Sequence, residues 1–356
     1  MRNLFLALNA SLALVLAAGP GYSQNKDDNK EDISFRTFDG VLIKGTFYPG
    51  AKGDKSPTVM MLHKYGGNSN ATGWVALAKR LQEKGYSVLA FDFRGHGLST
   101  TIIDPEKFWK YQPNVTYYAK TPKKGQDTIK IGDFKSSYFP FLLNDIIAAR
   151  QDLDNRNDNG GCNVSNILVI GAEEGAALGL TWMTYEFFRE SINVKAPGVV
   201  VPWVWQPNKL VLDRPASEDL AGGVWLSATH FPQKINAPYS HCMNLTKDKL
   251  RTIPMWFTYG EADKVGKEDA HYIADILKLN KGDLKIKNPT LPIKGETTLR
   301  GAGLLGVAKL DTEDLIEKFM DQMVKLRPNE AKKNRNANEF KFNSAPLSGL
   351  GFSGYP

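Results

Sequence analysis

Two carboxylates in this sequence stand where a side chain could act on a substrate. Glu173 lies in the run GAEEG (171–175), between an apolar segment and a segment with helical spacing. Asp263 ends the run YGEAD (259–263), which also follows an apolar segment. A carboxylate at such a turn can orient a histidine, move a proton or attack an electrophilic carbon. We therefore take Glu173 and Asp263 as candidate site residues.

Two further runs follow apolar segments in the same way. LHKYGG (62–67) comes after TVMML, and DFRGHGLS (92–99) ends the run that begins SVLAF. If the apolar segments are parallel strands, all four runs meet at the carboxyl edge of one sheet, where open α/β sheets hold their sites.

The elements that must position these runs alternate along the chain. Asp39-Gly40 between two alternating segments predicts a hairpin, continuous apolar runs predict buried strands, and i, i+3, i+4 spacing predicts helices. The expected strands are 33–37, 41–48, 58–62, 87–93, 166–170, 223–227, 255–259 and 284–293, and the expected helices are 74–84, 144–153, 175–189, 265–279 and 311–326. This order predicts an α/β fold with a mostly parallel sheet of about eight strands and helices on both faces.

Five segments fall outside this alternation. Residues 1–23 combine Arg2, an apolar run and small residues at a cleavage position, which is typical of a secretory signal. A polar linker (24–32) precedes the predicted domain (33–327), and a Lys-, Asn- and Gly-rich tail (328–356) follows it. Aromatic and proline-rich segments at about 100–140 and 194–220 are expected to be lid-like insertions at the sheet edge.

Taken in order, the four runs resemble the α/β-hydrolase family over residues 33–326. The D-x-R-G-H-G-x-S pattern is the most specific of them, and GAEEG has the context of the nucleophile elbow. The resemblance implies a triad in the order nucleophile, acid, histidine, with backbone N–H groups that stabilise an oxyanion. It also implies that Arg94 and His96 pack their loop, while Asp145 is expected to be solvated or to cap a helix.

This sequence departs from the family pattern at the reacting positions. Glu173 stands at the nucleophile position, Asp263 at the acid position and Arg300 at the histidine position, and no histidine follows His271. Lys64 and Glu174 stand at the oxyanion-hole positions, and Lys64 replaces a usual glycine. We expect Glu173, Asp263 and Arg300 to form one ion network.

Two functions are compatible with these departures. In the first, the protein has lost hydrolase chemistry and serves as a binding or structural protein. In the second, it is an ester or peptide hydrolase with relocated residues, which needs a histidine such as His230 or His241 within reach of Glu173. A nucleophilic Glu173 is disfavoured, because the extra methylene relative to aspartate displaces the carboxylate and no histidine is placed to release an ester.

The amino-acid composition argues against several classes of protein and partner. The 356 residues carry 45 Lys+Arg and 38 Asp+Glu, which is too mild an excess for a dedicated nucleic-acid binder. Five histidines and two cysteines give little material for a metal site, so we expect no metal and no cofactor. We expect an exported protein, periplasmic or extracellular, with no stable membrane span and with an unidentified ligand or small-molecule substrate. Pairing of Cys162 with Cys242 depends on geometry that the sequence does not give.

Overall fold

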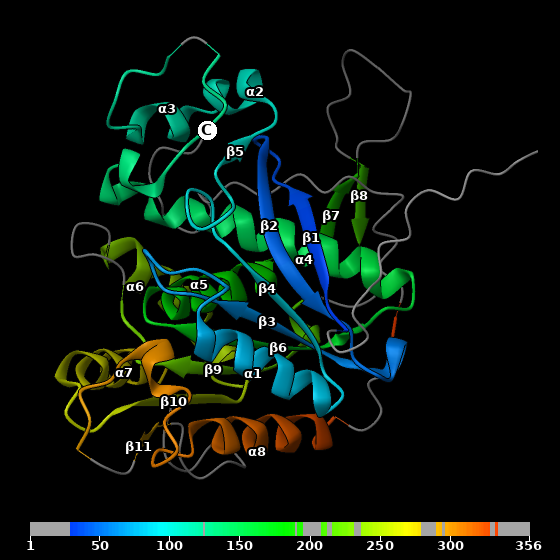
Figure 1. Cartoon of the computed structure of the whole chain (residues 1–356), viewed down its shortest axis with the longest axis vertical. Coiled ribbons are helices and arrows are strands. Elements are labelled where there is room, and N and C mark those ends of the chain that lie inside the picture. The colour runs from blue at the N-terminus through cyan, green and yellow to red at the C-terminus, as the bar shows by residue number, and fades with distance from the viewer. Residues whose placement is uncertain are drawn as a thin grey trace, which may run out of the picture.

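A large mixed sheet crosses the molecule, with helices against both of its faces (Figure 1). The computed structural model describes residues 29–123, 125–188, 191–194, 208–211, 216–230, 236–278, 290–293, 296–327 and 332–333. The strand order is β1-β2-β4-β3-β6-β9-β10-β11, and the short strand β5 pairs with β2. All neighbours from β4 to β11 are parallel, whereas β1 and β2 are antiparallel additions. The prediction of a mostly parallel α/β sheet of about eight strands is thereby confirmed.

The elements follow the predicted alternation. The strands of the sheet are β1 (Glu31–Arg36), β2 (Val41–Tyr48), β3 (Pro57–Leu62), β4 (Ser87–Phe91), β5 (Thr101–Ile102), β6 (Asn163–Ala172), β9 (Leu220–Leu226), β10 (Met255–Gly260) and β11 (Thr290–Ile293). The helices that the sequence predicts are α1 (Thr72–Glu83), α4 (Leu143–Asp158), α5 (Glu174–Phe188), α7 (Lys264–Ile276) and α8 (Thr312–Lys325). The first strand begins at Glu31, two residues earlier than predicted.

The buried strands divide their side chains between two cores. In β3, Val59 and Met61 belong to the core beneath α1 and α8, whereas Met60 and Leu62 belong to the core beneath α4 and α5. Successive side chains of a strand point to opposite faces, so a continuous apolar run is what a strand covered on both sides requires.

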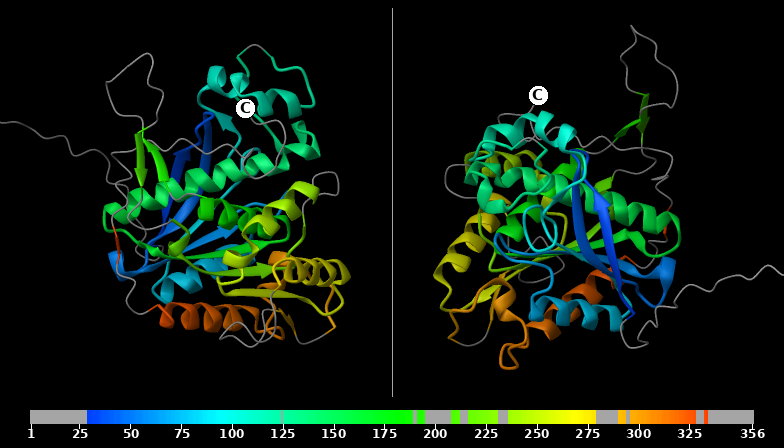
Figure 2. Two further views of the ribbon diagram at one scale, coloured as in Figure 1. Left: turned by 180° about the vertical axis from the view of Figure 1, so that it is seen from behind. Right: turned by 45° about the horizontal axis from the view of Figure 1, so that its top comes forward.

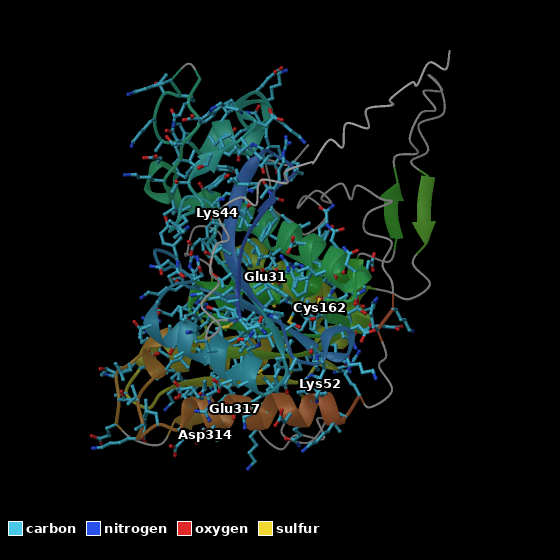
Figure 3. The ribbon with its side chains drawn as sticks, turned by 45° about the vertical axis from the view of Figure 1, so that its right-hand side comes forward. Glu31, Lys44, Lys52, Cys162, Asp314 and Glu317 are labelled. Carbon is cyan, nitrogen blue, oxygen red and sulfur yellow. The ribbon has the colours of Figure 1, made fainter. Side chains whose placement is uncertain are left out.

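Ion pairs join α1 to α8 on one face of the sheet. Arg80 of α1 contacts both Glu317 and Asp314 of α8, and Lys84 Nζ lies 3.3 Å from a Glu317 oxygen. Figure 3 shows Glu317 and Asp314 on α8, below α1 in that view. These pairs are partly exposed and contribute little each, so the apolar core holds this layer.

The first predicted insertion adds a cap beside the hairpin of β1 and β2. It contains α2 (Pro105–Lys110), α3 (Gln112–Tyr117) and two short 3-10 helices, η2 (Ile131–Asp133) and η3 (Ser136–Leu142). The views of Figure 2 place this cap on the side of the molecule away from α8. The sequence predicted an insertion here but not these helices.

A buried arginine joins this cap to the sheet. Arg94 bonds to Asp39 at 2.6 Å, to Asp145 at 2.8 Å and to the Tyr138 hydroxyl at 3.0 Å. All four side chains are inaccessible to solvent. The expectation that Asp145 is solvated was wrong, because the start of α4 packs directly against the loop that carries Arg94.

Other parts of the chain were not anticipated. Helix α6 (Asn236–Leu250) and a hairpin of β7 (Ser191–Val194) and β8 (Asn208–Val211) lie in regions where no element was predicted.

Most of the second insertion, the signal segment and nearly all of the tail lie outside the described residues. No helix in the described ranges has the length and apolar character needed to cross a membrane. Cys162 is a buried free thiol, and the side chain of Cys242 is outside the described part.

Candidate functional site at the elbow after strand β6

Glu173 occupies a strained turn between β6 and α5. Its φ is +50°, in the left-handed region that residues other than glycine rarely adopt. Its N–H donates to the Leu226 carbonyl of β9 at 3.0 Å, which fixes the turn on the neighbouring strand. A Cβ on Gly175 would lie 2.4 Å from the Leu62 carbonyl oxygen, so only glycine lets α5 approach β3 this closely. The run GAEEG thus makes the sharp strand–turn–helix that the sequence predicts.

The Glu173 carboxylate is buried and pairs with a lysine. Its Oε1 lies 3.4 Å from Nζ of Lys64, whose side chain is half exposed. The backbone of Gly301 covers the other side, since a Cβ there would be 2.7 Å from Oε1. Glu173 therefore points into a space bounded by Lys64 and Gly301.

Arg300 contacts the acid of the predicted triad. Its Nε lies 3.2 Å from Oδ1 of Asp263, and the same oxygen accepts the N–H of Gly266 at 3.0 Å, which caps α7. Arg300 thus stands against Asp263, as a triad histidine would. Oδ2 of Asp263 and Nε of Arg300 make no hydrogen bond among the described residues.

The expected single network is in fact two separate ion pairs. Arg300 pairs with Asp263, and Glu173 pairs with Lys64, with no ion pair between Glu173 and Arg300 in the described part of the chain. The reason is local: the backbone of Gly301, not the guanidinium of the preceding residue, packs against the Glu173 carboxylate.

The carboxylate of Glu174, one of the two residues predicted at the oxyanion-hole positions, bonds to the loop after β3. Oε2 of Glu174 accepts the N–H of Tyr65 at 3.2 Å. The N–H that meets this carboxylate belongs to Tyr65, whereas Lys64, the other predicted position, directs its side chain to Glu173. Burial raises the pKa of Glu174, and the negative charge of Glu173 raises it further.

Two histidines near this edge are held by backbone groups. His63 Nε2 accepts the N–H of Phe93 at 3.0 Å, and its Nδ1 lies 2.7 Å from the Lys64 carbonyl. His96 accepts the N–H of Gly66 at 3.0 Å and donates to the Arg94 carbonyl at 3.0 Å. Burial lowers the pKa of both rings, that of His63 to about 4, so both are neutral near pH 7. Both nitrogens of each ring already contact backbone groups, so neither histidine has a free nitrogen that could act as a base.

A third histidine forms a pair with an aspartate. His230 follows β9, and its Nδ1 lies 2.5 Å from Oδ1 of Asp269 on α7. The preceding residue, Thr229, donates its N–H to the Glu173 carbonyl at 3.3 Å. His230 therefore directly follows a residue that is bonded to the elbow. No sequence pattern indicated Asp269, which is an ordinary helix position. The side chain of His241 is outside the described residues.

Buried hydroxyls complete the surroundings of the elbow. Ser227 is fully buried with φ at +47°, and it directly follows β9, whose last residue Leu226 pairs with Ala172. Its Oγ and the Oγ1 of buried Thr229 make no hydrogen bond within the described ranges. In the part of the chain that the structure describes, no group of three or more His, Cys, Asp or Glu is arranged to hold a metal.

The strand order, the elbow and the loops at its edge define an α/β-hydrolase fold. The family model described as alpha/beta hydrolase fold matches residues 57–157.

Several solved structures are similar to it. An esterase from Pyrococcus furiosus is 17% identical, with 82% of this chain and 90% of that chain covered and a TM-score of 0.48. A putative alpha/beta hydrolase from Agrobacterium tumefaciens is 16% identical, with 85% and 99% covered and a TM-score of 0.44. Est1E from Butyrivibrio proteoclasticus is 12% identical, with 83% and 99% covered and a TM-score of 0.44. At these values the likenesses carry no argument about activity, and the curated proteins gave no match.

Proposed function

We propose that this protein is an exported member of the α/β-hydrolase fold that has lost hydrolase chemistry and acts by binding. The observation that carries the proposal is the contact of Arg300 with Asp263, Nε to Oδ1 at 3.2 Å. A triad needs a group there that takes a proton from the nucleophile and returns it to the leaving group. A guanidinium stays protonated at any physiological pH, so it cannot do so.

The nucleophile position supports the same proposal. The Glu173 carboxylate is paired with Lys64 and packed against Gly301, which holds it in place. The Tyr65 N–H, which could donate to an oxyanion, is bonded to the carboxylate of Glu174, and a negative group there opposes a second negative charge. Export is proposed from the secretory pattern of residues 1–23.

The test is hydrolysis of p-nitrophenyl acetate and butyrate by the chain that begins at Gln24. We expect the wild type to show the same rate as Glu173→Ala and as the control Glu261→Ala, which removes an exposed carboxylate from the loop after β10. Turnover that Glu173→Ala abolishes and Glu261→Ala preserves would refute the proposal.

A second function, an unusual hydrolase, is favoured by one observation. The pair of His230 and Asp269, at 2.5 Å, has the form of a base held by its orienting carboxylate. If this pair is catalytic, the wild type hydrolyses one of the two esters, and both His230→Ala and Asp269→Asn reduce kcat. His271→Ala is the matched control, because that ring lies on the same helix near the Tyr259 hydroxyl.

A further inference from the structure

A cavity of about 600 Å³ lies in the cap, and no residue of the elbow lines it. Its walls come from Thr100, directly before β5, and from residues 118–123 and 126–133, between α3 and η3. Ligand pockets in proteins have volumes of about 300 to 1,000 Å³, so this cavity has the size of a site for a small molecule.

Backbone hydrogen bonds fix the walls of this cavity. The N–H of Ile129 donates to the Thr100 carbonyl at 2.9 Å, which attaches one wall to the segment before β5. The N–H of Ala119 donates to the Asp133 carbonyl at 2.8 Å, which closes the loop at its base.

Gln126 joins further parts of the wall through its side chain. Its Nε2 donates to the Tyr118 hydroxyl at 2.6 Å and to the Thr128 carbonyl at 3.0 Å. Its Oε1 accepts the N–H of Lys123 at 3.1 Å, and its carbonyl accepts the indole N–H of Trp109 at 3.0 Å. The cavity is therefore shaped before a ligand enters, and a preformed site loses little conformational entropy on binding.

The charged side chains of the wall leave the cavity positive. Three of them are the lysines Lys120, Lys123 and Lys130, and one is the carboxylate of Asp133, so the net charge is +2. Lys120 pairs with Asp133, whereas Lys123 and Lys130 make no ion pair with any residue that the structure describes. Positive charges around a concave surface attract anions.

Hydroxyl groups of the wall can bond to oxygen atoms of a ligand. Tyr118 lines the cavity and is only 7% exposed. Its hydroxyl accepts from Gln126, and its own hydrogen meets no acceptor within the described ranges, so an O–H donor is held at the wall. Three threonines line the cavity as well, and each hydroxyl can both donate and accept: Thr100, Thr121 and Thr128.

We propose that this cavity binds the phosphate ester of a small hydroxylated molecule, such as a sugar phosphate. A phosphate monoester carries a charge of about −1.5 to −2 at pH 7 and three acceptor oxygens, which match the charge of the wall. Lys123, Lys130 and the Tyr118 hydroxyl hold the phosphate, and the threonines bond to the hydroxylated part.

The volume favours an ester over inorganic phosphate. One water molecule takes up about 30 Å³ of liquid, so a lone phosphate would leave most of the 600 Å³ to solvent. The inference goes beyond the proposed function, because this site is separate from the elbow and stands whether or not the protein hydrolyses esters.

The experiment is calorimetric titration of the chain that begins at Gln24 with glucose 6-phosphate, and with glucose, glucuronate and inorganic phosphate as comparison probes. We expect glucose 6-phosphate to bind most tightly of the four. The indole N–H resonance of Trp109, assigned with Trp109→Phe, should shift on binding, because Trp109 is bonded to Gln126 in the wall.

Three variants test the residues of the wall. Lys123→Ala, Lys130→Ala and Tyr118→Phe should each weaken the binding of glucose 6-phosphate by about tenfold, since each removes a donor to a charged group. Both lysines are exposed, so their replacement should leave the fold intact. Lys107→Ala is the matched control, because it removes an exposed lysine of α2 that does not line the cavity, and it should leave the affinity unchanged.

Several results would overturn the inference. One is wild-type protein that does not bind glucose 6-phosphate, or binds it with an affinity that Lys123→Ala and Lys130→Ala leave unchanged. Another is equally tight binding of glucose, glucuronate or inorganic phosphate. Binding to phosphatidylglycerol vesicles without binding of glucose 6-phosphate would assign the positive charge to a membrane surface instead. Ester hydrolysis is measured separately, so failure of this site leaves the proposed function untouched.

Discussion

Replacement of Gly301 by alanine should destabilise the protein by two effects that can be separated. Alanine at the φ of +52° costs about 1 to 2 kcal/mol. The new Cβ would also lie 2.7, 2.9 and 3.2 Å from Oε1, Cγ and Cδ of Glu173, and such overpacking costs about 1 to 3 kcal/mol. We expect Gly301→Ala to lower the free energy of unfolding by about 2 to 5 kcal/mol.

The two effects separate in a double-mutant cycle with Glu173→Ala, which removes all three contacting atoms. In that background Gly301→Ala should cost only the backbone part, leaving a coupling of about 1 to 3 kcal/mol in urea unfolding. Gly306→Ala is the matched control, because Gly306 has a φ of +74° and no atom within 4 Å of an added Cβ, so its cost should not change with residue 173. Additive effects of Gly301→Ala and Glu173→Ala would refute the packing of Glu173 on Gly301.

Three further predictions concern stability and reactivity. Arg94→Met leaves two carboxylates buried without their cation and should lower the free energy of unfolding by about 3 to 5 kcal/mol, whereas Arg251→Met, at a surface pair, should change it by less than about 1 kcal/mol. The fold lowers the pKa of His63 to about 4, so on acidification this ring is protonated in the unfolded chain at a higher pH than in the folded protein. The contribution of His63 to the free energy of unfolding should be complete above about pH 6.5 and should fall by about 3 kcal/mol toward pH 4. His63→Gln should remove that part of the pH dependence, and an unchanged profile would contradict the assignment. Burial raises the pKa of the Cys162 thiol to about 12, so in a Cys242→Ser background iodoacetamide should label it only when urea unfolds the chain, and rapid labelling of the folded protein would contradict its burial.

The sequence predicts most of the sheet because its signals are local. Apolar runs, helical spacing and the Asp-Gly turn each depend on residues close together in the chain. Helix α6 was missed because its sequence, NAPYSHCMNLTKDKL, has a weak apolar periodicity. The burial of Asp145 was missed because it depends on Arg94, some fifty residues earlier in the chain.

The site was predictable as positions but not as contacts. Family order indicates Glu173, Asp263 and Arg300, and the structure brings Arg300 onto Asp263. Arg300 makes no ion pair with Glu173 in the described part of the chain, because the backbone of Gly301 packs against that carboxylate. The spacing of residues in the sequence gives no sign of such a backbone contact. The same is true of Glu174, whose side chain turns back onto the N–H of Tyr65.

The buried Arg94 has a consequence for the cooperativity of the molecule. Its guanidinium is bonded at once to the hairpin through Asp39, to η3 through Tyr138 and to the start of α4 through Asp145. Asn114 of α3 adds a bond of 2.9 Å to the same Asp39. Opening the cap alone would remove the hydrogen bonds of Tyr138 and Asn114 from this buried ion cluster and expose the cluster to water. The cap and the sheet should therefore exchange their amide hydrogens as one unit, at the rate of global unfolding.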